Sequence, residues 1–187
     1  MFLVFDSETT GFFHPRLVQL GWLLYDSNHN LVEEACHIIK PDGFSIPKAA
    51  TAVHGISTQQ AREEGISLEV VLNKFNESAK RAKVAIAHNF SYDDVVVKNE
   101  YRRCGMDYPL ADLTKICTQK GATDFCKLPS SKGGYKWPKL SELHQTLFNR
   151  EFDGAHNALE DARACANCFF ELKNKGVLSI PQAIAIK

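Results

Sequence analysis

MFLVFDSETTG, residues 1–11, joins an apolar run to two carboxylates that follow it at once. Residues two apart on an extended strand project from the same face, so Asp6 and Glu8 are expected to point the same way. Two like charges side by side are costly to remove from water, and a divalent cation offsets that cost. The stretch therefore predicts a buried first strand that forms one side of a metal site.

Composition limits the class of protein. The chain has 187 residues, of which 44% are hydrophobic and 24% are charged, as is typical of a soluble globular protein. This length suits one domain, and we expect residues 1–187 to form it. The formal net charge is zero, so no global field draws the protein to nucleic acid. Local basic patches, metal ions or a tethering partner would have to do so.

The first residues do not resemble a targeting signal. The apolar start covers only residues 1–5 and lacks a basic segment and a cleavage-like site. No apolar run approaches the length that spans a membrane, so no membrane partner is expected. A cytoplasmic location follows by default, and phage and nuclear origins stay open.

The six cysteines are expected to be reduced thiols, because no secretory signal accompanies them. Cys165 and Cys168 form a C-x-x-C pair, which could suggest zinc or redox chemistry. Their apolar neighbours have helical spacing, however, and no second Cys/His pair has the usual ligand spacing. Buried thiols on a helix face are therefore favoured.

Hydrophobic periodicity predicts an α/β layout. Three strands are expected at 2–6, 17–25 and 31–40, as a meander, and a fourth at 84–87. Helices are expected at 49–53, just after Ser57, 68–82, about 93–103, 140–148 and about 157–175. The stretch 110–117 is ambiguous, with a short strand around Asp112-Leu113 as one interpretation, and 118–138 is expected to be a loop. This order favours a sheet between helices.

Two further segments carry chemistry. In His88-Asn89-Phe90-Ser91-Tyr92-Asp93, the aspartate starts a helix at the carboxyl edge of the sheet, where backbone N–H groups favour negative charge. His156-Asn157-Ala158-Leu159-Glu160-Asp161 opens the last helix, and small residues would let that helix pack closely on a sheet. Both segments could therefore converge on one cleft.

Together these residues predict phosphodiester hydrolysis with two divalent ions, Mg²⁺ or Mn²⁺. Carboxylate oxygens suit these ions, and two ions about 3.5–4 Å apart can clamp the attacking and leaving oxygens. A histidine can take a proton from the attacking water near neutral pH. The candidate metal ligands are Asp6, Glu8, Asp93 and Asp161, and with His156 they form the candidate catalytic set.

At this point the sequence resembles the DnaQ-like, or DEDDh, 3′–5′ exonuclease family, which includes the proofreading subunit of bacterial DNA polymerase. The motif D-x-E-T matches residues 6–9, H-N-x-x-[FY]-D is similar to 88–93, and H-x-A-x-x-D matches 156–161. A V-H-G-I segment lies at 53–56. Any one motif is weak, but all of them in order over residues 2–175 are specific.

The resemblance implies a ribonuclease H-like fold with a mixed five-stranded sheet flanked by helices. It also implies a metal-dependent exonuclease that releases nucleoside 5′-monophosphates from the 3′ end of single-stranded or frayed nucleic acid. In the family pattern, Asp6, Glu8 and Asp161 would hold the first metal, with Asp6 bridging to the second. Asp93 would act partly through metal-bound water, and His156 would be the general base, which places the chain in the His subclass.

The same resemblance implies a substrate-binding set. Thr9 and the turn before Phe12 would contact the terminal nucleotide, and the Phe12 ring would stack on a base. Val53 and His54 would line the nucleotide pocket. Tyr92 would lie beside the scissile phosphate.

Three interpretations of function remain open. DNA is the expected substrate, with a DNA polymerase as a candidate partner. An RNA 3′–5′ exonuclease, of the oligoribonuclease or RNA-maturation type, is the alternative within the enzyme class. The third is a non-catalytic polymerase-accessory module that binds nucleic acid, although a binder would not need the complete acidic set.

A basic stretch and several aromatic residues stay outside these motifs. Six lysines between 115 and 139 face only Asp124: Lys115, Lys120, Lys127, Lys132, Lys136 and Lys139. A solvated flexible loop explains them, but they could also attract phosphates. His88 is expected to orient its turn rather than to bind metal. The remaining aromatics considered, expected in the core or as loop anchors, are Phe13, Trp22, Phe90 and Trp137.

Overall fold

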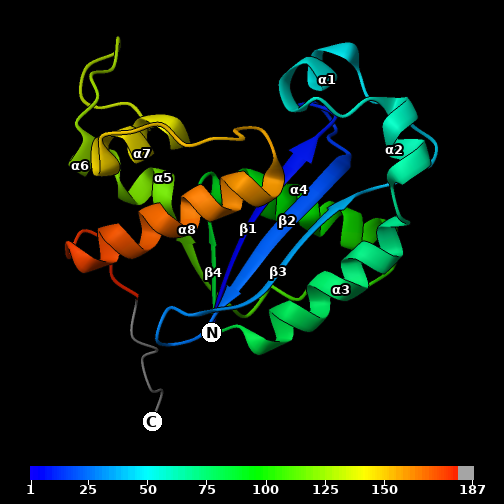
Figure 1. Ribbon diagram of the computed structural model, residues 1–187, viewed down its shortest axis with the longest axis horizontal. Helices are drawn as coiled ribbons and strands as arrows, with labels where there is room; N and C mark the ends of the chain where they lie inside the picture. Colours follow the sequence, from blue (N-terminus) through cyan, green and yellow to red (C-terminus); the bar gives the residue numbers. More distant parts are fainter. Residues whose placement is uncertain (181–187) are drawn as a thin grey trace.

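A five-stranded sheet with the order β3-β2-β1-β4-β5 forms the centre of the computed structural model, which describes residues 1–180 (Figure 1). Its strands are β1 (Phe2–Thr9), β2 (Leu17–Tyr25), β3 (Leu31–Ile38), β4 (Val84–Ala87) and β5 (Thr114–Cys117). β1 pairs antiparallel with β2 and parallel with β4, while β2–β3 is antiparallel and β4–β5 parallel. The predicted mixed five-stranded sheet is confirmed.

Helices cover both faces of the sheet. They are α1 (Lys48–His54), α2 (Thr58–Glu64), α3 (Leu68–Arg81), α4 (Phe90–Arg103), α5 (Thr118–Gly121), α6 (Thr123–Cys126), α7 (Leu140–Phe148) and α8 (Ala158–Asn174). The long helix α8 packs on one face, whereas α3 and α4 pack on the other. In Figure 1, α1 lies beside the end of β1.

The alternation of side chains along β1 builds both halves of the core. Phe2 and Val4 pack in the cluster that includes α8, whereas Leu3 and Phe5 pack in the cluster that includes α3 and α4. All four are buried because the strand lies in the middle of the sheet. The same alternation carries forward into the acidic residues that follow.

Several predicted boundaries are wrong. β1 continues past Asp6 to Thr9, because its backbone stays paired with β2 across an irregularity at Glu8/Thr9. α4 begins at Phe90 rather than near Asp93, so that aspartate lies in the first turn. β3 ends at Ile38 rather than at residue 40.

The segment after α4 differs most from the prediction. The suggested strand at Asp112-Leu113 is instead β5 at 114–117, which pairs with β4. Part of the expected loop at 118–138 forms α5 and α6, because Thr118 and Ala122 are fully buried. Tertiary packing stabilises the helices in this stretch, although its polar composition is typical of a loop.

Two other predictions concern α8 and the chain as a whole. Cys165 and Cys168 are free thiols buried on α8, as predicted from helical spacing. Among the helices of residues 1–180, none combines the length and apolar character needed to cross a bilayer. Residues 181–187 of the expected 1–187 domain lie outside the described residues.

Candidate active site

The carboxyl end of β1 supplies three polar side chains to alternate faces. Asp6 and Glu8 continue the row of Phe2 and Val4 toward α8, as the period of the strand requires. Ser7 projects to the opposite side, and its hydroxyl donates to Asp93 Oδ1 at 2.6 Å. The strand thus provides two acids and positions a third.

Asp93 reaches the site from the start of α4. This helix begins soon after β4, whose carboxyl end lies beside β1 in the parallel pair. Asp93 is 3% exposed and lies in the first turn, where the helix dipole favours an acidic group. The short connection from β4 therefore places it near the β1 acids, as predicted.

Two residues of β2 hold the start of α8 directly on the sheet. Gly21 pairs with Asp6, and a Cβ atom on Gly21 would lie 2.5 Å from the carbonyl carbon of Ala158. Gln19 pairs with Glu8, and its Oε1 accepts a hydrogen bond from the Ala158 N–H at 2.9 Å. Backbone atoms at the start of α8 thus occupy the space on β2 that a side chain at position 21 would fill.

This close approach brings the third motif over β1. The His156 N–H donates to Asp161 Oδ2 at 2.9 Å, while Asn157 Oδ1 accepts from the Leu159 N–H at 3.1 Å and caps the helix. His156 has a φ of 68°, a left-handed conformation that few non-glycine residues adopt. The ligand atoms of Glu8, His156 and Asp161 all lie within 4.8 Å of one another.

The acids disfavour one another's ionisation. Burial raises the pKa of Asp6 well above its usual range, and the charges of Asp93, Asp161 and Glu8 raise it further. Burial, with Asp161 and Asp93, raises the pKa of Glu8 to about 8. Burial also raises the pKa of Asp93 to about 7 and that of Asp161 to about 6. A donor set in this state suits a divalent cation, whose charge would reverse these shifts.

All five candidate catalytic residues line one cavity of about 540 Å³. Phe12 and Tyr92 line the same cavity, and their rings meet edge to face at 5.7 Å. Five polar residues outside the predicted set also line it: Ser7, His88, Asn89, Lys139 and Ser141. The cavity therefore collects residues from β1, α4, the segment before α8 and the start of α7.

The remaining predicted substrate-binding residues differ in their distance from the cavity. The Tyr92 hydroxyl donates to the Gly11 carbonyl at 2.9 Å and lies 2.7 Å from Thr9 Oγ1, which ties α4 to the turn before Phe12. Val53 and His54 lie at the end of α1, and neither lines the cavity. The Phe12 ring is 90% exposed, so it is open to a ligand.

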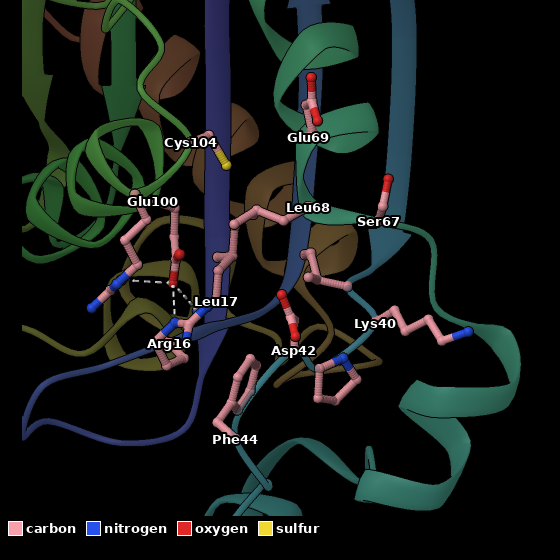
Figure 2. A pocket seen from close by; sticks show the side chains of 13 residues that line it. Arg16, Leu17, Lys40, Asp42, Phe44, Ser67, Leu68, Glu69, Glu100 and Cys104 are labelled. Atoms are coloured by element: carbon pink, nitrogen blue, oxygen red, sulfur yellow. Dashed lines mark hydrogen bonds and ion pairs between the residues drawn. The ribbon is translucent and has the colours of Figure 1, made fainter.

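Glu100 lies beside Arg16 and Leu17 (Figure 2), at the other end of the turn that carries Phe12. Its carboxyl group is buried, and Oε1 accepts from Arg16 Nε and from the Leu17 N–H, both at 3.0 Å. Arg103 Nη1 lies 3.0 Å from the same oxygen. Arg16 also closes the turn, since its backbone N–H donates to Thr10 Oγ1 at 3.0 Å. Arg16, Leu17, Glu100 and Arg103 line a separate cavity of about 490 Å³.

Ser7, Gln19, Gly21 and Glu100 are positioning residues that sequence reasoning missed. A glycine and a glutamine inside an otherwise apolar strand were the available signals for β2. Glu100 carried no comparable signal, because it is one of several charged residues on a helix.

Comparison with known proteins adds three findings. A sequence profile named RNase_T and described as "Exonuclease" matches residues 3–169. The chain is 27% identical over 176 residues to "DNA polymerase III PolC-type" of Caldanaerobacter subterraneus subsp. tengcongensis. It is 28% identical over 177 residues to "DNA polymerase III subunit epsilon-like protein" of Rhodobacter capsulatus. The matches cover 93% and 91% of this chain but only 12% and 23% of those relatives.

Among solved structures, E. coli Exonuclease I in complex with a dT13 oligonucleotide is similar, with a TM-score of 0.78 and 22% identity. The zinc-bound form of an E. coli ExoI–ssDNA complex has a TM-score of 0.74 and 24% identity. The first match covers 92% of this chain and the second 93%, and each covers 40% of the other chain. This likeness confirms the ribonuclease H-like fold.

Proposed function

The chain belongs to the RNase_T exonuclease family, and on that premise we propose that it is a metal-dependent 3′–5′ exonuclease that acts on single-stranded or frayed DNA. The products would be nucleoside 5′-monophosphates. The observation that carries this proposal is the meeting of Asp6, Glu8, Asp93, His156 and Asp161 in one cavity, although they come from three distant segments.

The four carboxylates would hold two divalent ions, Mg²⁺ or Mn²⁺. Such ions would offset the repulsion among the acids and the negative charge of the phosphodiester. Asp6 would be the central ligand of this set, because three neighbouring carboxylates raise its pKa, more than for any other acid of the site. Glu8 and Asp161 would share one ion, in line with the approach of their ligand atoms.

His156 would take the proton from the attacking water at a ring nitrogen. Its side chain is exposed within the cavity, and its backbone is held by Asp161. The approach of its ring to Glu8 and Asp161 also allows a second role, as a metal ligand. Phe12 would stack on the terminal base, and Thr9 and Tyr92 would hold the turn that presents it.

Single-stranded DNA is the substrate that the comparisons favour, since two of the similar Exonuclease I structures are complexes with dT13 and dA16 oligonucleotides. RNA remains the alternative. A polymerase partner is part of the proposal because both curated relatives carry DNA polymerase III names. Co-purification with the replicative polymerase from the source organism would test that part.

The deciding experiment uses 5′-labelled single-stranded DNA and RNA oligomers with Mg²⁺, Mn²⁺ or EDTA. We expect stepwise shortening from the 3′ end that EDTA stops and that is faster on DNA. Circular single-stranded DNA should resist, because it has no end. If RNA is shortened faster than DNA, RNA rather than DNA is the preferred substrate.

A matched pair of variants controls the assay. Asp6→Asn should abolish turnover, whereas Asp112→Asn, an exposed aspartate outside the cavity, should behave as the parent protein. A folded protein that binds either oligomer but cleaves neither with any metal would favour the non-catalytic module instead.

A further inference from the structure

We propose that the segment 127–139, here called the basic hairpin, together with Lys120, binds the single strand that leads away from the terminal nucleotide. The proposal rests on the proposed function, because it assigns a binding surface to the upstream part of the same substrate. It concerns residues outside all the motifs.

The basic hairpin is an ordered element rather than a flexible loop. Pro129 and Tyr135 form an antiparallel bridge, and the Lys136 N–H donates to the Leu128 carbonyl at 2.9 Å. Gly133 and Gly134 both have positive φ, at 86° and 71°, as a tight turn requires. The tip therefore has a defined shape.

His88 fastens the base of the hairpin to the active site. Its Nε2 lies 2.9 Å from the Pro138 carbonyl, which can only accept, so Nε2 carries the hydrogen. Nδ1 then accepts from Thr118 Oγ1 at 3.0 Å. Burial lowers the pKa of His88 to about 4, so the ring is neutral near pH 7. This contact explains His88 without a metal: it joins the end of β4 to the hairpin.

The hairpin is continuous with the cavity. Lys139 is the last residue of the hairpin, and Lys139, Leu140 and Ser141 all line the cavity. A strand whose 3′ end occupies the cavity must leave it across an adjacent surface. The hairpin forms one such surface.

The charge of the hairpin is of one sign. Residues 127–139 include four lysines and no acidic residue. Lys136 pairs with Glu142, and outside the hairpin Lys115 pairs with Asp94, so these two are already neutralised. Among residues 115–139, the exposed lysines with no ion pair are Lys120, Lys127, Lys132 and Lys139. On a chain of zero net charge, they form a local site for phosphates.

Exposed aromatic rings accompany these charges. Trp137 is 58% exposed and Tyr135 47% exposed. Lys120 Nζ lies 5.4 Å from the centre of the Trp137 ring. Rings beside cations are the combination that binds single strands through stacking and charge.

The aromatic predictions are therefore only partly right. Trp22 and Phe90 are buried as predicted, whereas Phe13 is 87% exposed and does not belong to the core. Trp137 lies outside the core in the hairpin, which the alternative prediction of a loop anchor allows. The Trp137 ring is thus open to a ligand and lies beside the Lys120 cation, which supports the assignment of the hairpin as a contact surface.

The test compares a long and a short substrate within each variant. We expect Trp137→Ala to lower the ratio of kcat/KM on dodecathymidylate to kcat/KM on trithymidylate by about fivefold or more, from a stacking contribution of about 1–3 kcal/mol. The ratio cancels differences in active fraction. Trp137→Phe should retain most of it, because a ring remains.

The lysines are tested by salt dependence. Lys120→Gln/Lys127→Gln/Lys132→Gln should flatten the dependence of log Kd on log salt by about 0.7 per lost phosphate contact. Kd is measured by fluorescence anisotropy on labelled oligothymidylate in EDTA, so it does not depend on cleavage. The control, Lys74→Gln/Lys98→Gln, removes exposed charges from α3 and α4, on the face opposite α8.

If the ratio of kcat/KM on the long and the short substrate and the salt dependence of Kd are both unchanged in these variants, the hairpin proposal is overturned while the proposed exonuclease activity is not. Conversely, a protein that binds long oligomers through the hairpin but shortens none would overturn the proposed function alone. The two failures are therefore distinguishable.

Discussion

Asp6 lies directly opposite Gly21 in the antiparallel pair of β1 and β2. Partners across such a pair project to the same face, so any side chain at position 21 would stand beside the Asp6 carboxylate. Its place is taken by the backbone of Ala158 and Leu159. The hydrogen atom of one glycine thus determines how closely α8 approaches the acids of β1.

Gly21→Ala should disturb the site without touching its chemistry. The added methyl group would collide with helix backbone and push α8 away, and a displacement of about 1 Å can lower turnover about 100-fold. We expect a loss of kcat of that order and a destabilisation of about 1–3 kcal/mol in urea unfolding. Parental kcat in the variant would show that the contact does not position Asp161.

A second-site control sharpens this prediction. Because the collision involves backbone atoms of Ala158 and Leu159, shortening the side chain cannot relieve it. Gly21→Ala/Ala158→Gly should therefore remain as impaired as Gly21→Ala. Recovery in the double variant would mean that side-chain packing, rather than backbone contact, is limiting.

The metal-free protein should lose stability as the pH rises from about 5 to about 8. The pKa values of Glu8, Asp93 and Asp161 rise to about 8, 7 and 6 on folding, so the folded state binds more protons than the unfolded state in this window. Stability is thus full below the unfolded pKa values, near 4, and is lost through the folded ones. We expect a loss of about 2–4 kcal/mol in urea unfolding with EDTA.

Metal ions should reverse this trend. In the proposed site Mg²⁺ or Mn²⁺ would bind the ionised acids of the folded state, so the stabilisation by metal should grow with pH. Asp6→Asn removes the acid with most carboxylate neighbours and should flatten the pH dependence without metal. Asp112→Asn should retain the parental slope. A metal effect that is equal at pH 5 and pH 8 would contradict the assignment.

His156→Ala should separate proton transfer from metal binding. A general base contributes about 10²–10⁴-fold to kcat, so we expect a loss of that order if His156 has the proposed role. Mn²⁺ affinity by calorimetry should stay close to that of the parent. Glu8→Gln provides the comparison, since loss of a carboxylate ligand should weaken Mn²⁺ binding. Equal losses of Mn²⁺ affinity in both variants would make His156 a ligand.

Glu100→Ala should destabilise the fold and loosen the turn that carries Phe12. It removes the shared partner of Arg16, Arg103 and the Leu17 N–H, which we expect to cost about 2–4 kcal/mol in urea unfolding. KM should rise more than kcat falls. Glu77→Ala, which breaks an exposed pair with Lys80, should cost at most about 1 kcal/mol. Equal effects of the two variants would remove the special role of Glu100.

The sequence predicted elements whose signals are local. β2 and β4 were placed correctly because continuous apolar runs identify buried strands, and the acids of the three motifs indeed share one cavity. β5 was misplaced because four residues, Thr114–Cys117, become a strand only through pairing with β4. Its own side chains alternate too briefly to show this.

The positioning residues escaped prediction for the same reason. Gln19 acts on Ala158 across 139 residues of sequence, and Ser7 acts on Asp93 across 86. No pattern in either neighbourhood specifies the partner. Such contacts become visible only when the sheet and both helices are placed in space.

The contact between Gly21 and α8 also gives metal affinity a diagnostic value. Asp161 meets Glu8 only after the last long helix has docked on strands formed by the first residues of the chain. A partly folded molecule, or one that ends before α8, would hold only an incomplete acidic set. Titration with Mn²⁺ would therefore count the molecules in a preparation that have completed their fold, independently of any substrate.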